Sequence, residues 1–232
     1  MSTIADNITQ VSSRIHAAAQ AAHRDEHSVQ LLAVSKTKPA EALREAHAAG
    51  IRDFGENYLQ EALGKQLELA DLPLIWHFIG PIQSNKTRAI AEHFAWVHSV
   101  DRLKIAQRLS EQRPSDLPPL NICIQVNVSG EASKSGCTPE DLPALAQAIS
   151  QLPRIRLRGL MAIPEPTENR ADQDAAFAAV QQLQASLNLP LDTLSMGMSH
   201  DLESAIAMGA TWVRIGTALF GARGSQQTPS QP

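Results

Sequence analysis

Short apolar runs alternate with alanine-rich amphipathic stretches along most of this chain. Before the first run, Ile4, Ile8, Val11 and Ile15 recur at three- to four-residue spacing, which predicts an amphipathic helix over residues 4–23. Eight apolar runs follow, each succeeded by a helical stretch or a helix-start signal: residues 31–35, 52–55, 74–79, 95–98, 121–128, 157–161, 194–196 and 212–215.

This strict alternation predicts a parallel sheet, and eight parallel strands are the number that closes a barrel. The alternative is an open doubly wound sheet, but no G-x-G-x-x-G pattern follows the first run. We therefore expect one α/β domain over residues 1–224, a (β/α)8 TIM barrel with an extra N-terminal helix. Residues 225–232 are polar and proline-bearing, and we expect them to be a disordered tail.

Composition narrows the class of protein. The 232 residues are 43% hydrophobic and 19% charged, enough for one domain with a substantial core. The net charge of −4 argues against a broad nucleic-acid-binding face. No apolar stretch reaches the ~20 residues of a membrane span, and the N-terminus lacks a signal-type run, so we expect a cytoplasmic protein. Cys123 and Cys137 are expected to be reduced thiols.

The loops after the seventh and eighth runs have the features of a phosphate site, which this kind of barrel usually places there. Ser199 follows Gly197, and we expect it to be the N-cap of the next helix, so that its hydroxyl and the following amides face an anion. Gly216 lets the backbone approach a ligand closely, and Thr217 adds a second hydroxyl. A plain structural helix cap is the alternative for Ser199.

Lys36 directly follows the first apolar run, at the barrel mouth where reactive groups of such enzymes lie. A lysine after a strand is often only solvated. Here its stem can lie inside the mouth, and an amine partly removed from water can attack a carbonyl. Combined with a phosphate site, this lysine predicts a phosphorylated aldehyde held as an imine. Pyridoxal 5′-phosphate (PLP) fits that description, and so does a sugar-phosphate substrate of an aldolase.

Arg214 helps to separate these two ligands. It lies two residues before Gly216, and its guanidinium keeps its proton in practice. A fixed cation there could donate to a pyridine nitrogen and keep that nitrogen unprotonated, which favours PLP. The alternative is an ion pair with a carboxylate such as Glu56 at the same end of the barrel.

Seven segments carry long and specific patterns: LLAVSKTKP from Leu31, DFGENYLQE from Asp53, WHFIGPIQSNK from Trp76, VNVSGEASKSG from Val126, RGLM from Arg158, LSMGMS from Leu194 and VRIGTALFGAR from Val213. Over residues 5–224 the chain resembles the YggS/PROSC-type pyridoxal phosphate homeostasis proteins. Six residues match that family's cofactor-binding positions: Lys36, Asn57, Ser199, Arg214, Gly216 and Thr217. The resemblance implies that the lysine holds PLP as a Schiff base, and that the serine, glycine and threonine bind its phosphate. It implies that the arginine faces the pyridine nitrogen and that the asparagine lies near the ring.

The resemblance also implies the barrel domain of alanine racemase standing alone, usually as a monomer. The function it implies is storage or delivery of PLP in vitamin B6 homeostasis, with transient contacts to PLP-dependent apo-enzymes and no established catalysis. Lys38 and Lys134 could tune release of the cofactor, with solvated surface charge as the alternative for each.

The residues themselves agree with a carrier. Racemisation needs an acid/base group on each face of the cofactor, and Lys36 could serve only one. Tyr58, the only tyrosine, is expected to be a packing or loop residue. A PLP-dependent racemase or lyase on the same site remains the alternative.

Overall fold

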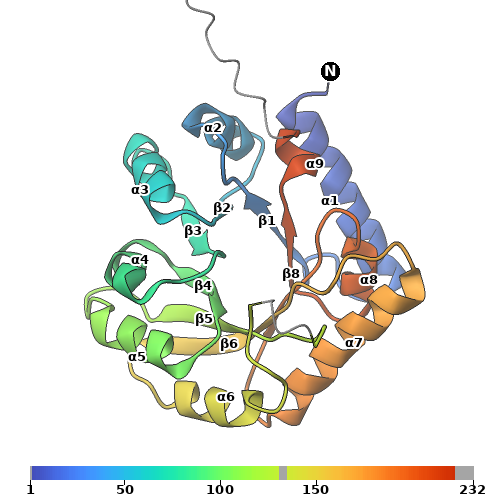
Figure 1. The fold of residues 1–232 in the computed structure, drawn as a ribbon. Helices are drawn as coiled ribbons and strands as arrows, with labels where there is room; N and C mark the ends of the chain where they lie inside the picture. Colours follow the sequence, from blue (N-terminus) through green and yellow to red (C-terminus); the bar gives the residue numbers. More distant parts are fainter. Residues whose placement is uncertain (1, 131–134, 223–232) are drawn as a thin grey trace, which may run out of the picture.

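Helices and parallel strands alternate throughout the computed structural model, which describes residues 2–130 and 135–222 (Figure 1). The strands of this part of the chain are β1 (Gln30–Val34), β2 (Asp53–Glu56), β3 (Ile75–Phe78), β4 (Trp96–Val100), β5 (Leu120–Gln125), β6 (Ile155–Met161), β7 (Thr193–Ser195) and β8 (Trp212–Ile215). The helices are α1 (Ile4–Ala21), α2 (Ala40–Ala48), α3 (Leu59–Glu68), the 3-10 turn η1 (Ser84–Lys86), α4 (Thr87–His93), α5 (Leu103–Gln112), α6 (Leu142–Ser150), α7 (Arg170–Ser186), α8 (Leu202–Ala207) and α9 (Thr217–Phe220).

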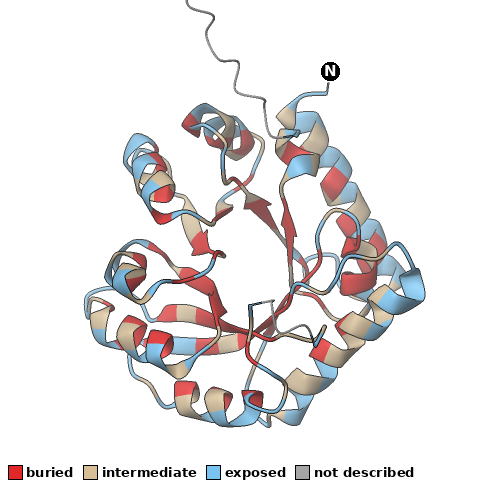
Figure 2. Cartoon of the chain, in the orientation of Figure 1, coloured by how far each residue is buried: buried red, intermediate tan, exposed pale blue. Residues whose placement is uncertain are grey.

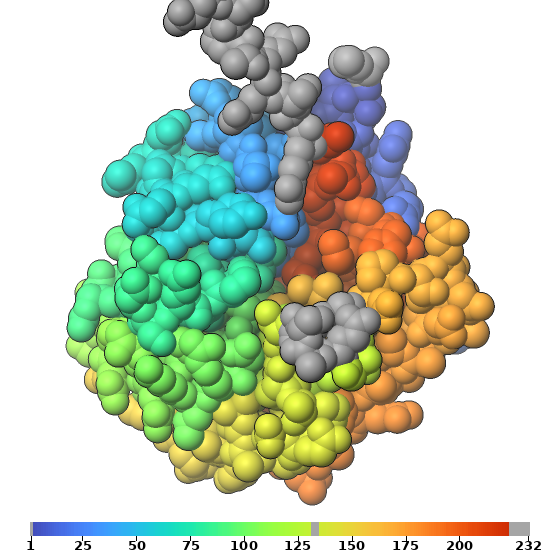
Figure 3. Space-filling model, in the orientation of Figure 1, coloured from blue at the N-terminus to red at the C-terminus, as the bar shows by residue number. Residues whose placement is uncertain are grey.

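The strands close into a barrel. Each pairs in parallel with the next in sequence, and β8 returns to pair with β1 in the register Gln30↔Trp212 to Ala33↔Ile215. The predicted (β/α)8 barrel is confirmed, and the doubly wound alternative is wrong. Figure 3 shows the consequence for the surface, where successive parts of the chain occupy successive sectors around the molecule.

The apolar core lies in and around the strands. Strand residues are mostly buried, whereas the surrounding helices alternate buried and exposed positions (Figure 2). In α2, for example, Leu43 and Ala46 are fully buried because they lie three residues apart on one helix face, while the other face stays in water. Burial of these apolar faces against the sheet is the main favourable term that holds the layers together.

The predicted N-terminal helix is confirmed as α1, which runs outside the barrel along α8 and α9 (Figure 1). It ends at Ala21, two residues earlier than predicted. Its apolar face is buried: Ile8, Val11 and Ile15. Arg14 on the same helix pairs with Glu203 of α8 at 2.8 Å, which holds α1 against α8.

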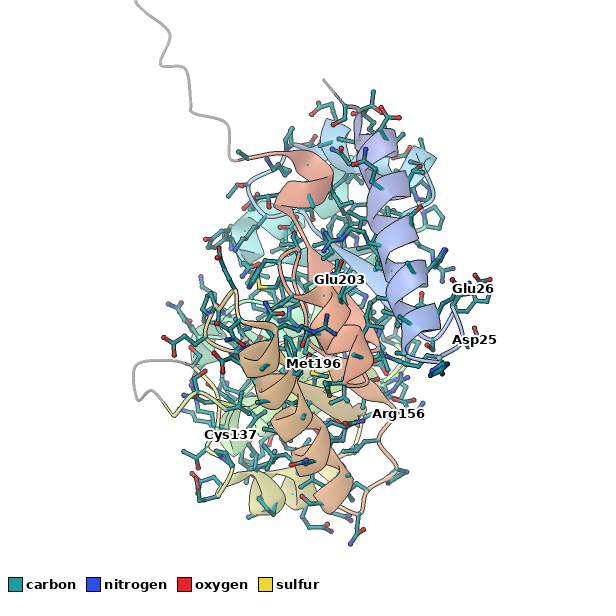
Figure 4. The ribbon with its side chains drawn as sticks, turned by 90° about the vertical axis from the view of Figure 1, so that its right-hand side faces the viewer. Asp25, Glu26, Cys137, Arg156, Met196 and Glu203 are labelled. Carbon is teal, nitrogen blue, oxygen red and sulfur yellow. The ribbon has the colours of Figure 1, made fainter. Side chains whose placement is uncertain are left out.

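Figure 4 shows the barrel from the side and separates its two ends. Cys137, in the segment after β5, lies toward the end where the strands finish. Asp25 and Glu26, which precede β1, and Arg156 at the start of β6 lie toward the opposite end.

The strand limits differ from the predicted ones mainly at β5, which ends at Gln125 instead of residue 128. Val126 forms an isolated bridge with Cys137, and the Asn127 N–H donates to the Cys137 carbonyl, so the chain leaves the barrel sheet there. The predicted tail over residues 225–232 and Lys134 lie outside the described residues. None of the described helices combines the length and apolar character that a membrane span requires.

Candidate functional site

The six predicted site residues all lie at or near the ends where their strands finish: Lys36 after β1, Asn57 after β2, Ser199 between β7 and α8, Arg214 as the third residue of β8, and Gly216 and Thr217 after β8. Parallel strands bring these ends to one face of the barrel. The residues therefore share the face on which such barrels build their sites.

Two contacts bring the β1, β7 and β8 loops together. A Cβ added to Gly216 would lie 3.4 Å from the Cβ and the carbonyl oxygen of Val34, so the β8 loop lies against β1 just before Lys36. The Arg214 N–H donates to the Gly197 carbonyl at 2.9 Å, so the loop after β7 begins beside β8. These two contacts place the predicted phosphate loops side by side and next to the lysine.

Asn57 lies beside the loop after β3. A Cβ on Gly80 would fall 2.4 Å from the Asn57 carbonyl oxygen, so the two loops touch through their backbones. The side-chain Oδ1 of Asn57 is buried and has no hydrogen-bond partner within the described part of the chain. Buried oxygens of this kind are normally satisfied, which makes Asn57 available to a ligand or a water molecule.

Lys36 is half-buried, and its amine has no hydrogen bond or ion pair with any residue in 2–130 or 135–222. Its neighbour Thr37 has a φ of +66°, a left-handed conformation that is unfavourable for a β-branched residue. The Thr37 N–H donates to the Glu61 carboxylate, and such strained conformations persist when the surroundings hold them. The backbone around the lysine is therefore fixed, while its amine is bound by no residue that the structure describes.

A buried ion-pair network on β2 and α3 holds this backbone. The Lys65 amine donates to Glu56 Oε1 at 2.6 Å and to the Ser35 carbonyl at 2.7 Å, and it pairs with Glu61 at 2.9 Å. The Ser35 hydroxyl donates to the same Glu56 oxygen at 3.1 Å. Burial raises the pKa of Glu56, and the attraction of Lys65 opposes that rise. The network thus holds the residues on both sides of Lys36.

The ion pair between Arg214 and Glu56, the alternative left open by the sequence, is wrong. Glu56 pairs with Lys65 instead. Arg214 is buried, and its Nη1 donates to the Ser195 hydroxyl at 2.8 Å while its Nη2 donates to the Ala162 carbonyl at 3.0 Å. Burial lowers the pKa of Arg214 to about 10, so the guanidinium stays charged at neutral pH. It is a fixed cation inside the barrel end.

The prediction that Ser199 is a helix N-cap is wrong. Helix α8 begins at Leu202, and its N-cap is Asp201, whose Oδ1 accepts from the Met198 N–H at 2.6 Å. The aspartate closes the turn after Gly197, so the helix starts two residues later than expected. Ser199 lies within that turn, where its carbonyl accepts from Arg14 at 2.8 Å. Its hydroxyl is thereby not required for capping.

The loop after β8 is built differently. Gly216 is the N-cap of α9, which is only four residues long, and Thr217 is exposed at its start. Backbone N–H groups of the next turn are already used, because Leu219 and Phe220 both donate to the Gly216 carbonyl at 2.9 and 3.0 Å. The hydroxyls of Ser199 and Thr217 make no hydrogen bond with another residue in the described part of the chain.

Comparisons with known proteins decide the family. The alanine racemase N-terminal domain family matches residues 5–224. A pyridoxal phosphate homeostasis protein of Pseudomonas aeruginosa is 80% identical, over 96% of this chain and 97% of that protein. A protein with the same description from Vibrio cholerae is 56% identical, over 96% of this chain and 98% of that protein. A solved structure of PipY from Synechococcus elongatus with PLP bound has 44% identity and a TM-score of 0.84, and covers 94% of this chain and 100% of that one.

The chain belongs to the pyridoxal phosphate homeostasis protein family. In this member of the family, Tyr58 is the N-cap of α3 and is 51% exposed, with no side-chain cap bond. The prediction that Tyr58 is a packing or loop residue is confirmed, because it lies in the loop between β2 and α3.

Sequence reasoning missed two site residues of this homeostasis family member, Lys65 and Ser195. A signal for Lys65 was present, because it continues the three-residue spacing of the buried Leu59 and Ala62 on one face of α3. A charged residue on an apolar helix face is rare unless it is paired. For Ser195 the signal was weaker, since a serine at the end of a strand is common in any barrel.

Proposed function

We propose that this chain binds PLP as a Schiff base on Lys36 and acts in intracellular PLP homeostasis, by storing the cofactor or delivering it, without catalysing a reaction of its own. The observation that carries the proposal is Lys36 itself: a half-buried lysine at a strand end, with a fixed backbone and an amine that no described residue binds. The PLP-bound structure of PipY, which is 44% identical, supports the choice of ligand.

The residues fit the chemistry of this cofactor. PLP supplies an aldehyde, which condenses with a lysine amine and releases one water. Lys36 provides the amine. Arg214 provides a charged donor for the pyridine nitrogen, and because it keeps its proton, it leaves that nitrogen unprotonated. Asn57 Oδ1, which is buried and has no hydrogen-bond partner among the described residues, can accept from a group near the ring.

The phosphate is assigned to the two neighbouring loops. Ser199 and Thr217 offer hydroxyls, and Gly216 leaves room for close approach of the backbone. Gly197, with a φ of +102°, makes the turn that brings the first of these loops beside β8. The site rests on hydroxyl and amide donors of the loops, not on a helix dipole, because α8 and α9 are short.

A carrier role fits these residues better than catalysis. An unprotonated pyridine nitrogen is a weak electron sink, and Tyr58 is exposed rather than placed as a second acid/base group. We also propose that the protein is a cytoplasmic monomer that contacts PLP-dependent apo-enzymes transiently. The unpaired, buried thiols Cys123 and Cys137 are consistent with a reducing compartment.

The experiment is a spectroscopic titration of cofactor-free protein with PLP. An imine absorbance band should form in the wild type and be absent in Lys36→Ala. Lys38→Ala is the matched control: this amine donates to the carbonyls of Gly221 and Ala222 at 3.1 Å, so its removal should leave the band in place. A band that persists in Lys36→Ala, or one lost only in Lys38→Ala, would refute the assignment.

A further inference from the structure

A continuous chain of hydrogen bonds runs through the barrel interior behind Arg214. The Asp53 carboxylate lies 2.9 Å from His77 Nε2, and His77 Nδ1 lies 2.9 Å from His98 Nε2. His98 Nδ1 lies 2.8 Å from the Ser195 hydroxyl, which in turn accepts from Arg214 at 2.8 Å. Five residues on five different strands are thus joined end to end by four hydrogen bonds.

The two ends determine the direction of every proton in the chain. A carboxylate can only accept, so His77 carries its proton on Nε2 and accepts on Nδ1. His98 must then donate from Nε2 and accept on Nδ1. The Ser195 hydroxyl donates to that nitrogen and accepts from Arg214, which can only donate. All four bonds therefore point from the arginine toward the aspartate.

The packing supports neutral imidazoles in the middle of the chain. His77 and His98 are fully buried, and burial lowers the pKa of both, so neither carries a charge near neutral pH. His77 is stacked on Trp96 at 5.5 Å and meets Trp212 edge-on at 4.9 Å. His98 lies 5.8 Å from the Trp96 ring as well, so aromatic rings restrict the rotation of both imidazoles.

The far end of the chain lies where the strands begin. Asp53 is the first residue of β2, and its side chain is 17% exposed. It lines a hollow together with Gln30, Gly50 and Ile51, which precede or begin strands β1 and β2. The candidate cofactor site is at the opposite end, where the strands finish.

We propose that Asp53, His77, His98 and Ser195 are positioning residues that hold the guanidinium of Arg214 in one orientation from the far end of the barrel. The proposal deepens the proposed function, and rests on it for the consequence that the held guanidinium faces the ring nitrogen of PLP. Within residues 2–130 and 135–222 no carboxylate pairs directly with Arg214. Burial lowers the pKa of Arg214, and the charge of Asp201 opposes that lowering without a direct contact. Asp201 Oδ1 accepts from the Met198 N–H instead.

The four hydrogen bonds from Asp53 to Arg214 restrict rotation of the Arg214 guanidinium. Without Ser195 as a fixed acceptor, the Ala162 carbonyl would be its only partner among the described residues. Ser195 can accept from Arg214 in a fixed direction only while its own proton is committed to His98. That commitment depends on the tautomer of His98, which His77 sets. Carboxylates commonly fix the tautomer of a histidine in protein sites. Here the effect of Asp53 reaches Arg214 through three residues, His77, His98 and Ser195.

The first test uses cofactor-free protein and nitrogen-15 NMR of the histidine and arginine side chains. Both His77 and His98 should be neutral with the proton on Nε2. In Ser195→Ala and in Asp53→Ala, hydrogen exchange of the Arg214 guanidinium should quicken by roughly tenfold or more, the factor expected for loss of a charge-assisted bond. Asp53→Asn keeps an acceptor for His77 and should largely restore the slow exchange.

Asp192→Ala is the matched control. Asp192 is a half-exposed carboxylate that pairs with Arg158 at 2.9 Å and does not belong to the chain, so its removal should leave the Arg214 exchange unchanged. If Ser195→Ala quickens the exchange and Asp53→Ala does not, the proposal is overturned, and the histidines serve only as packing. Either histidine carrying its proton on Nδ1 alone would overturn it as well.

A second readout links the chain to the ligand. In a PLP titration, Asp53→Ala should weaken binding several-fold and Asp53→Asn and Asp192→Ala should not. Unchanged binding by Asp53→Ala beside quickened Arg214 exchange would refute the consequence for PLP. If the wild type itself takes up no PLP, the proposed function fails, and the NMR measurements on cofactor-free protein still decide whether the chain holds Arg214.

Discussion

Replacing Lys65 by methionine should expose how much the ion-pair network beside Lys36 depends on a buried charge. Methionine keeps the apolar stem but removes the ammonium that donates to Glu56 and to the Ser35 carbonyl. The Lys65 and Glu56 side chains are 7% and 0% exposed, so water does not replace the lost partner. Among the described residues, the carboxylate would be left with the Ser35 hydroxyl as its one hydrogen-bond donor.

The magnitude follows from the pKa of the carboxyl. The variant can avoid a buried unpaired charge by protonating Glu56. In the unfolded chain this carboxyl has its ordinary pKa of 4.5. Keeping it protonated at pH 7 therefore costs about 3.4 kcal/mol of stability, at about 1.36 kcal/mol per pH unit. At pH 5 the same cost is only about 0.7 kcal/mol. The estimate at pH 7 agrees with the ~3–5 kcal/mol found when one partner of a buried pair is removed.

The direction in which the stability loss changes with pH is the decisive observation. A carboxyl with a raised folded pKa makes the folded state relatively more stable at low pH, and this advantage is lost as the pH rises through that pKa. Urea unfolding should thus show Lys65→Met to be less stable than wild type by about 3.4 kcal/mol at pH 7 and by about 0.7 kcal/mol at pH 5. A loss below about 1 kcal/mol at pH 7, or an equal loss at both pH values, would contradict the reasoning.

Two controls isolate the charge. The double variant Glu56→Gln/Lys65→Met buries neither charge and should regain at least half of the lost stability, with little dependence on pH between 5 and 7. Lys104→Met removes an exposed lysine of α5 and should change stability by less than about 0.5 kcal/mol.

Three further outcomes follow from burial and backbone geometry. Burial lowers the pKa of His98, so below about pH 6.5 the unfolded chain binds a proton on this residue and the folded chain does not, and stability falls on acidification. In urea unfolding followed from pH 7 to 5, His98→Gln should reduce this pH dependence of stability by up to about 1.4 kcal/mol per pH unit. Burial raises the pKa of Cys123 to about 12 and that of Cys137 to about 11, so a thiol reagent at pH 8 should label native protein only slowly and both residues fully after unfolding; rapid labelling of native protein would speak against this burial. Gly197→Ala should cost about 1–3 kcal/mol and weaken PLP binding, because the φ is +102° and the new Cβ would meet Ala205 Cβ at 2.6 Å; an equally stable variant would show that the turn is not constrained.

The fold could be predicted from the sequence because local patterns determine it. Eight apolar runs in strict alternation with helices leave few topologies, and closure of β8 on β1 follows from the number of strands. The ends of elements were less predictable. The end of β5 depends on the bridge between Val126 and Cys137, a contact between two segments that the local sequence pattern does not predict.

The candidate site was predictable as a set of strand ends but not as a set of contacts. Lys36 and Arg214 lie at positions where a barrel places functional groups. The residues that contact them could not be predicted from residue spacing in the sequence. Glu56 pairs with Lys65 because α3 begins shortly after β2 and carries Lys65 on its buried face, whereas the sequence left a pairing with Arg214 open. The N-cap of α8 was predicted wrongly because the Asp201 carboxylate accepts from the Met198 N–H and closes the turn that contains Ser199, so the helix begins only at Leu202.

The most direct test of the central claim is chemical trapping of the lysine. Wild-type protein loaded with PLP is reduced with borohydride, digested, and its peptides are analysed by mass spectrometry. Fragmentation of the modified peptide should place the reduced adduct on Lys36 and not on Lys38, and the peptide that contains Lys86 should be unmodified. An adduct confined to another lysine, with Lys36 unmodified, would contradict the account.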